Sequence, residues 1–243
     1  DLLPSDITGV NVFNQDSRTF EFRRGAIFAN IVVGDEINRA SPKTQSALLE
    51  CMAERQVTVD GTTYPLAGPF LVMATQNPIE MEGTYPLPEA QRDRFMARIS
   101  MGYPSGTAEL AMLQSHGEAD PLGSLEPVTD GATVQRQISA VRRLHTAPAL
   151  REYVVALVTA SRQHPSIRLG ASPRAGLHLL GAARANAALV GRDHVLPEDV
   201  QALAPAVLTH RLMLTGEAQL TGRTTGDVVA DILQRTPVPS GRR

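Results

Sequence analysis

The sequence has no tryptophan, one cysteine and few aromatic residues, and each of these shortages excludes something. With Cys51 alone the chain forms no internal disulfide, which fits a reducing compartment such as the cytoplasm. Because 4% of the residues are aromatic and 42% are hydrophobic, the core must be largely aliphatic. A formal net charge of −2 leaves no basic excess for binding nucleic acid. No predominantly apolar run reaches the ~18 residues that a membrane span needs.

Several motifs of common enzymes are also missing. No G-x-S-x-G nucleophile elbow, H-E-x-x-H pair or cysteine-rich metal spacing occurs, which argues against serine hydrolase and zinc chemistry. The phosphate-binding pattern G-x-x-x-x-G-K-[ST] is absent as well. The only lysine, Lys43, follows Ser41-Pro42 and so does not fit the lysine of such a loop.

The first half of the chain does contain short β-type segments. Thr19–Arg23 alternates as a half-buried strand does, whereas Ala29–Val33 and Phe70–Ala74 are apolar runs typical of strands buried on both faces. Asp60-Gly61 predicts a hairpin turn, and Ser41-Pro42 predicts the N-cap and first turn of a helix. Strands are thus expected at residues 19–23, 29–33, 56–59, 62–64, 70–74 and 98–101.

The second half has the pattern of helices alone. Residues 116–132 are rich in Gly, Pro, Asp and Ser and are interpreted as a linker. Beyond them, helices are predicted at about residues 134–145, 150–163, 173–190 and 197–212. The chain is therefore expected to have an α/β core at residues 1–115 and an α-helical domain at residues 133–243.

Two adjacent carboxylates, Asp35 and Glu36, follow the apolar run Ile31–Gly34. A strand that ends in this way places both acids in the crevice where α/β sheets bind ligands. Asp35 would suit a Mg²⁺ ion carried on phosphates, and Glu36 would orient or deprotonate a water that attacks the terminal phosphate. The alternative is that both acids only favour the N-terminus of the next helix.

Two further residues of the first half are candidates for the same chemistry. Asn77 stands at the end of the Phe70–Gln76 run, where its amide would hold the attacking water or the terminal phosphate; taken alone, the residue is more typical of an Asn-Pro turn. Arg94 is a candidate arginine finger that neutralises charge on a phosphoryl group bound by a neighbouring subunit. Arg92 is less favoured, and either arginine is otherwise a solvated residue with Asp93 as a local partner.

Arg174 is the fifth candidate residue. Ser172-Pro173 predicts a helix N-cap and first turn, which places Arg174 in that turn. A cation there opposes the helix dipole, and an anion shared between the arginine and the helix end would offset the cost. A nucleotide phosphate would serve, and an exposed arginine without a ligand is the alternative.

Several separate segments keep one order and spacing that is shared with a known family. They are residues 27–40 (IFANIVVGDEINRA), 42–50 (PKTQSALLE), 74–78 (ATQNP), 82–91 (EGTYPLPEAQ) and 93–95 (DRF), with residues 1–9 and 171–175 (ASPRA) in addition. With these segments the chain closely resembles the MoxR family of AAA+ ATPases. The resemblance covers nearly the whole chain and is weakest in the linker and near the C-terminus.

The resemblance implies a role for each matched residue. Asp35 and Glu36 correspond to the Walker B pair, with Asp35 binding the Mg²⁺ of ATP and Glu36 activating water. Asn77 corresponds to sensor 1, Arg94 to the finger that acts on a neighbouring subunit, and Arg174 to sensor 2 on an α-helical lid domain.

Family resemblance also implies an assembly and a client. Members use ATP and Mg²⁺, form rings such as hexamers whose hairpin at Asp60-Gly61 faces the pore, and are thought to remodel or mature partner complexes as chaperones. Their partners often carry von Willebrand factor A domains. We therefore expect a homo-oligomeric, cytoplasmic ATP hydrolase that binds a client protein, without nucleic acid and without a membrane span.

One departure from the family is large. Strands 1 and 2 of the family's parallel sheet, and the Walker A P-loop after strand 1, would precede Asp1. We therefore expect a partial AAA+ α/β core in a truncated chain, with backbone groups left unpaired beside the missing strand 1. By itself such a chain is expected to bind nucleotide weakly or not at all.

Two other functions stay open at this stage. A binding or assembly module that does not hydrolyse ATP would agree with the missing loop. A magnesium-chelatase-like motor subunit would share the same chemistry and differ in its client. The residues do not separate these functions, although the similarity to MoxR is the nearer one.

Overall fold

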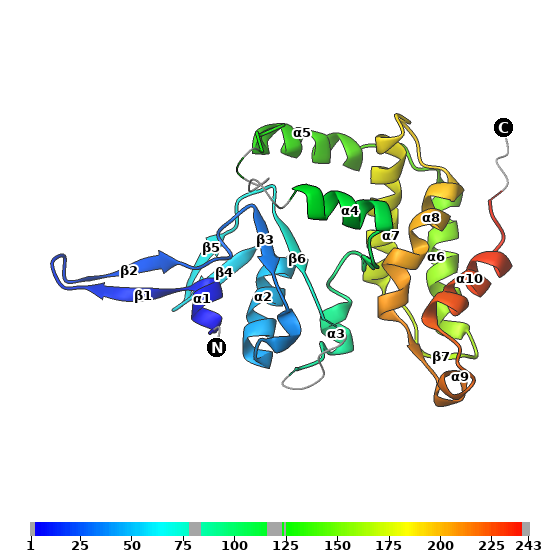
Figure 1. The fold of residues 1–243 in the computed structure, drawn as a ribbon, viewed down its shortest axis with the longest axis horizontal. Helices are drawn as coiled ribbons and strands as arrows, with labels where there is room; N and C mark the ends of the chain where they lie inside the picture. The colour runs from blue at the N-terminus through cyan, green and yellow to red at the C-terminus, as the bar shows by residue number, and fades with distance from the viewer. Residues whose placement is uncertain (1–2, 78–83, 116–122, 124, 240–243) are drawn as a thin grey trace.

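The computed structural model has a strand-rich half and a helical half, which lie side by side (Figure 1). It describes residues 3–77, 84–115, 123 and 125–239. The strand-rich half contains α1 (Pro4–Thr8), β1 (Gly9–Asn14), β2 (Thr19–Arg24), β3 (Ile31–Gly34), the 3-10 turn η1 (Ile37–Arg39), α2 (Pro42–Glu54), β4 (Gln56–Val59), β5 (Thr62–Pro65), β6 (Leu71–Ala74), α3 (Glu89–Arg92) and α4 (Gly106–Ser115). The helical half contains α5 (Gly131–Arg142), α6 (Pro148–Gln163), β7 (Ile167–Leu169), α7 (Pro173–Leu189), α8 (Pro197–Leu208), the 3-10 turn η3 (Thr209–Arg211), β8 (Met213–Leu214), α9 (Gly216–Leu220) and α10 (Thr225–Arg235).

The parallel pair β3–β6 is the centre of the strand-rich half. Gly34 lies opposite Ala74, so both strands end at the same edge. Val32 and Val72 pack toward the core that includes residues of α2, whereas Val33 is 61% exposed on the opposite face. The prediction that these strands are buried on both faces is therefore wrong for the described residues. An apolar run identifies such a strand, but its burial depends on what covers each face.

A strand at residues 98–101 was also expected, and the structure has none there. Ile99 is 78% exposed and Met101 is 91% exposed. The backbone N–H of Arg98 instead donates to the carbonyl of Ala206 in α8, at 2.9 Å. A strand needs a neighbouring strand to pair with, and none of the described residues supplies one here.

The β1–β2 hairpin extends away from the rest of the molecule (Figure 1). Its second strand was predicted, but not its partner β1 or its exposure. Phe20 is 71% exposed, and Phe22 is the one residue of β2 that is partly covered. One side of the hairpin contacts a second hairpin, which explains the alternation of β2. Most residues of β2 are nevertheless exposed, so the prediction of a half-buried strand is wrong for most of its length.

That second hairpin, β4–β5, confirms the prediction at Asp60-Gly61. Both residues have positive φ angles, 48° and 78°, as a two-residue type I′ turn requires. The two hairpins contact each other: the rings of Phe22 and Tyr64 stack with their centroids 4.0 Å apart, and Asn11 Nδ2 donates to Asp60 Oδ2 at 2.7 Å.

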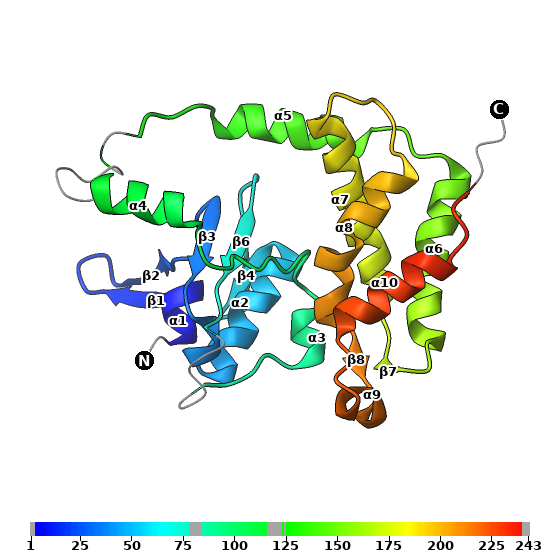
Figure 2. The same ribbon diagram turned by 45° about the vertical axis from the view of Figure 1, so that its right-hand side comes forward.

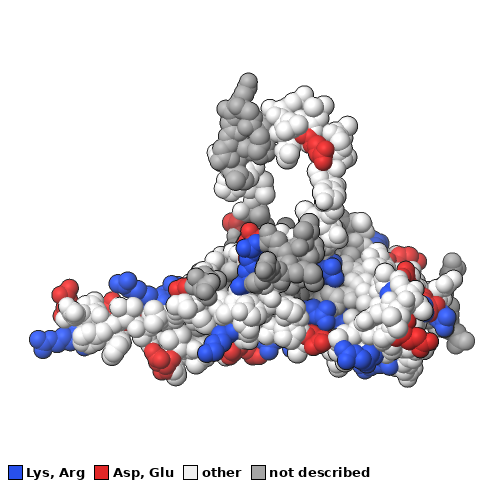
Figure 3. All heavy atoms as spheres, turned by 60° about the horizontal axis from the view of Figure 1, so that its bottom comes forward, with Lys and Arg blue, Asp and Glu red and all other residues white. Residues whose placement is uncertain are grey.

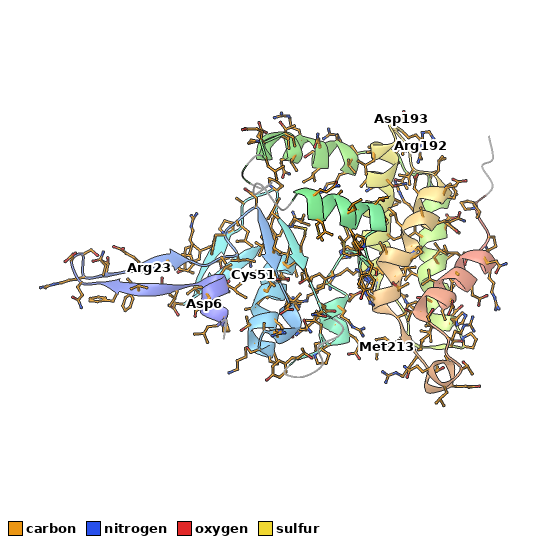
Figure 4. The ribbon with its side chains drawn as sticks, viewed as in Figure 1. Asp6, Arg23, Cys51, Arg192, Asp193 and Met213 are labelled. Carbon is orange, nitrogen blue, oxygen red and sulfur yellow. The ribbon has the colours of Figure 1, made fainter. Side chains whose placement is uncertain are left out.

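Helix α2 begins where Ser41-Pro42 predicts. Ser41 Oγ accepts a hydrogen bond from the backbone N–H of Thr44 at 3.3 Å, and Pro42 occupies the first turn. Cys51 lies on this helix (Figure 4) and is 3% exposed. Burial raises the pKa of its thiol to about 11, so Cys51 is uncharged and packs as a small apolar side chain.

The helical half has one continuous core. Helices α6, α7, α8 and α10 pack around it (Figure 2), with Leu157, Leu179 and Leu208 fully buried. The four predicted helices are confirmed, although α8 ends at Leu208 and continues as η3. Residues 116–122 and 124 of the predicted linker lie outside the described residues, and α5 begins inside the expected range of the linker, at Gly131. The short strands β7 and β8 and the helices α9 and α10 were not predicted.

On the face shown in Figure 3, side chains of both charge signs are interspersed. Among the described helices, none combines the length and the apolar character that crossing a bilayer requires.

Candidate active site

The ends of β3 and β6 bring Asp35 and Thr75 together. Because Gly34 lies opposite Ala74, the next residue of each strand meets its counterpart at the sheet edge. Thr75 Oγ1 donates to Asp35 Oδ1 at 2.5 Å and accepts the backbone N–H of Glu36 at 2.9 Å. The backbone carbonyl of Thr75 accepts the N–H of Ile37 at 3.1 Å. Thr75 therefore fixes both the side chain of Asp35 and the backbone of Glu36.

Sequence reasoning missed Thr75, although a signal existed. The argument that placed Asp35 at the end of one strand applies equally to the residue that follows Ala74. Knowing the register of the two strands would have identified it, but a register between strands this far apart in the chain is not written in either segment.

Glu36 adopts a conformation that non-glycine residues rarely have. Its φ of 45° turns the chain sharply into η1. Its carboxylate Oε2 lies 2.8 Å from Arg39 Nε, and the side chain of Glu36 is 37% exposed. Such conformations cluster at functional sites, and the carboxylate of Glu36 remains partly exposed beside Arg39.

A buried amide holds the turn that follows Glu36. Gln45 is 1% exposed, and its Nε2 lies 3.1 Å from the carbonyl of Ile37 and 3.2 Å from that of Ala40. The same nitrogen lies 3.1 Å from the carbonyl of Tyr85. Gln45 thereby anchors both η1 and the segment that leads to α3 to helix α2.

Asn77 lies two residues beyond Thr75 and is partly buried. It belongs to the chain that leaves β6 at the edge where Asp35 and Glu36 leave β3. The structure thus places three of the predicted site residues, Asp35, Glu36 and Asn77, at one edge of the parallel pair.

Arg94 lies elsewhere. Its Nη1 donates to the carbonyl of Leu49 at 2.7 Å, which is roughly 10 Å along α2 from Pro42 at 1.5 Å per residue. An open cavity of about 490 Å³ lies beside it and is lined in part by Glu50 and Glu54. Within the described part of the chain, no hydrogen bond or ion pair joins Arg94 to Asp35 or Glu36.

Arg174 has an intramolecular anion as its partner. Helix α7 begins at Pro173 as predicted, and Arg174 Nη1 lies 3.5 Å from Asp93 Oδ2. Ser172 Oγ lies 2.8 Å from each oxygen of the same carboxylate. The anion expected at the start of this helix is therefore present, but Asp93 provides it.

A second arginine, Arg211, which sequence reasoning also missed, is buried at this junction. Its side chain is 1% exposed, and its Nε donates to Asp93 Oδ1 at 3.0 Å. Its Nη2 donates to the carbonyl of Phe95 at 2.5 Å and lies 2.6 Å from His178 Nδ1. Burial lowers the pKa of Arg211, and the carboxylate of Asp93 counteracts that effect.

Two histidines at this junction, His178 and His210, have lowered pKa values. Burial, with the nearby charge of Arg211, lowers the pKa of His178, so its Nδ1 accepts from Arg211. Burial lowers the pKa of His210 to about 4, and the ring lies 3.2 Å through Nε2 from the carbonyl of Phe95. Both rings therefore serve the packing between the two halves.

The donor set at the sheet edge fits a magnesium ion that arrives on a nucleotide. No cluster of three or more His, Cys, Asp or Glu side chains able to hold a metal occurs among the described residues. Asp35 Oδ1 accepts from Thr75, no hydrogen bond to Oδ2 occurs among the described residues, and Asp35 as a residue is exposed. Mg²⁺ commonly takes one or two protein carboxylates and completes its shell with phosphate oxygens and water.

Comparison with known proteins gives consistent results. Residues 1–97 match the model for the ATPase family associated with various cellular activities (AAA), and residues 159–232 match the AAA lid domain. The uncharacterized protein YeaC of Bacillus subtilis is 51% identical over 100% of this chain and 76% of its own length. Chaperone MoxR1 of Mycobacterium tuberculosis is 43% identical over 98% of this chain and 65% of its own length. The crystal structure of an ATPase candidate from Cytophaga hutchinsonii superimposes with a TM-score of 0.90 at 39% identity, over 99% of this chain and 76% of that one.

Proposed function

The chain belongs to the MoxR family of AAA ATPases, and we propose that it hydrolyses ATP to remodel or mature partner protein complexes. The observation that carries this proposal is the pair of hydrogen bonds at the sheet edge, by which Thr75 holds the side chain of Asp35 and the backbone of Glu36 in place. Membership of an ATPase family supports a nucleotide-driven activity. The two carboxylates, held in place before a ligand binds, support hydrolysis of ATP.

Each residue at the sheet edge has a distinct part in the proposed reaction. Asp35 holds the Mg²⁺ that neutralises charge on the ATP phosphates, and Glu36 takes a proton from the attacking water. Asn77, at the same edge, orients that water or contacts the terminal phosphate. Thr75 holds the carboxylate of Asp35 in place by donating its hydroxyl hydrogen to Oδ1.

The two arginines act from outside this edge. Arg94 lies along α2, away from the carboxylates of its own chain, which supports a role on the nucleotide of a neighbouring copy. That arrangement requires a homo-oligomeric ring, for which we propose a hexamer. We propose that residues 133–243 form a lid domain over the core of residues 1–115. Arg174 belongs to this lid and contacts the nucleotide from it.

The proposed client is a protein complex. The relative from Mycobacterium tuberculosis is named a chaperone, which supports remodelling of a protein partner over a metabolic substrate. We propose a partner with a von Willebrand factor A domain. The single buried cysteine agrees with action in the cytoplasm.

Replacing Glu36 with Gln tests the division of roles. In the full-length gene product, Glu36→Gln should reduce ATP hydrolysis by about 100-fold or more, because the water loses its base, while ATP affinity stays within about twofold. Steady-state turnover and calorimetric binding of ATP are the two measurements. Glu109→Gln, an exposed substitution in α4, is the matched control and should change neither. Loss of binding together with hydrolysis would contradict the assignment.

A module that binds without hydrolysis is the second candidate, since the sequence contains no G-x-x-x-x-G-K-[ST] loop. For this reason we expect the 243-residue chain alone to bind ATP weakly. Hydrolysis by the full-length gene product would reject this candidate, and its absence there would favour it.

A further inference from the structure

The carboxylate of Asp93 stands where an anion is favoured. It lies at the N-terminus of α7, a helix of 17 residues, whose unpaired backbone N–H groups attract negative charge. Ser172, the residue before that helix, donates its hydroxyl to this carboxylate at 2.8 Å. A nucleotide phosphate bound by Arg174 would occupy the same electrostatic environment.

Asp93 contacts two arginines of very different exposure. Arg211 is 1% exposed and has Asp93 Oδ1 at 3.0 Å, so it is a permanent partner. Arg174 is 45% exposed and lies at 3.5 Å from Oδ2, beyond ordinary hydrogen-bond length. Arg174 can therefore leave Asp93 without stranding an uncompensated buried charge, whereas Arg211 cannot.

We propose that Asp93 is a positioning residue that competes with the nucleotide phosphate for Arg174. Without nucleotide the carboxylate holds the guanidinium at the start of α7. When ATP binds, the phosphate takes over Arg174, and Asp93 keeps Arg211 and Ser172. This inference rests on the proposed ATP-binding function. It predicts that loss of the Asp93 charge tightens nucleotide binding, whereas loss of a residue with only a structural role would weaken it.

A double-mutant cycle measures this competition. The full-length gene product, Asp93→Asn, Arg174→Ala and the double variant are titrated with ATPγS by calorimetry. Asp93→Asn keeps an oxygen acceptor but removes the charge, so ATPγS should bind about two- to five-fold more tightly, the range expected for a partly exposed ion pair. In the Arg174→Ala background the same substitution should change the affinity by less than about 1.5-fold.

The controls separate the possible outcomes. Asp16→Asn, in the exposed turn of the β1–β2 hairpin, should leave the affinity unchanged. Weaker or unchanged ATPγS binding by Asp93→Asn, or tightening that persists without Arg174, would overturn the inference while leaving the proposed function intact. No binding by the wild-type protein would overturn the proposed function and this inference with it.

A milder variant serves if Asp93→Asn does not fold. Ser172→Ala removes the hydroxyl donor but keeps the charge of Asp93, so the carboxylate depends more on Arg174. Ser172→Ala should then bind ATPγS about twofold more weakly than the wild-type protein. In the Arg174→Ala background, Ser172→Ala should leave the affinity for ATPγS unchanged. Tighter binding, no change, or an effect that persists without Arg174 would reject the competition.

Discussion

The two halves of the molecule differ in how completely their apolar side chains are covered. In the helical half Leu157, Leu179 and Leu208 are fully buried in one core. In the strand-rich half, Val33 and Leu71 of the parallel pair are 61% and 52% exposed. The proposed chemistry thus lies on the half whose apolar side chains are more exposed, while the helical half carries Arg174. Functional elements are commonly drawn from the less stable parts of a fold.

Substitutions in the two halves should show this difference most strongly. Leu179→Ala leaves a cavity in the helical core and should lower the free energy of unfolding by about 3 kcal/mol. Val33→Ala, on the exposed face of β3, should lower it by about 0.5 kcal/mol or less. Urea unfolding followed by circular dichroism measures both. Equal losses would mean that the exposed face of the sheet is covered in solution.

At the junction between the halves, His210 should make the free energy of unfolding depend on pH. His210 binds a proton at a pKa of about 4 in the folded state, against 6.5 when unperturbed. Between these values the unfolded chain holds more protons, so stability falls as the pH is lowered, by roughly 2 kcal/mol from pH 6.5 to 4.5.

Replacing the histidine tests this dependence. His210→Asn should flatten the pH dependence of the unfolding free energy in that window, whereas His194→Asn, at an exposed histidine, should not. An unchanged slope in His210→Asn would assign the acid sensitivity to other groups.

The smallest expected effect lies at the sheet edge. Thr75→Val keeps the shape of the side chain but removes the hydroxyl that joins Asp35 to Glu36, so turnover of ATP should fall about tenfold, or ~1.4 kcal/mol. The unfolding free energy should change much less. Thr63→Val, in the exposed β4–β5 hairpin, is the control. Unchanged turnover would remove Thr75 from the site.

The sequence predicted those features that depend on neighbouring residues. The cap at Ser41, the hairpin turn at Asp60-Gly61 and the start of α7 at Pro173 each follow from a few adjacent side chains. The placement of Asp35 at a strand end follows from a local pattern in the same way. The MoxR resemblance then identified the family as a whole.

The features that it did not predict depend on distant parts of the chain. Asp93 meets Ser172 across 79 positions and Arg211 across 118, and no local pattern encodes such a contact. The burial of β3 and β6 was misjudged for the same reason, because an apolar run does not say which of its faces will be covered. Residues 98–101 have β-type character but no strand beside them to complete the hydrogen bonds.

The stacked rings of Phe22 and Tyr64 join the two hairpins of the strand-rich half. The β1–β2 arm is joined to β4–β5 by that stack and by Asn11 and Asp60, and β4 follows directly from α2. The arm is therefore connected, through β4–β5, to helix α2, whose first residue, Pro42, lies six positions after Glu36. Under the proposed function, we expect a client protein that displaces this arm to shift α2 as well.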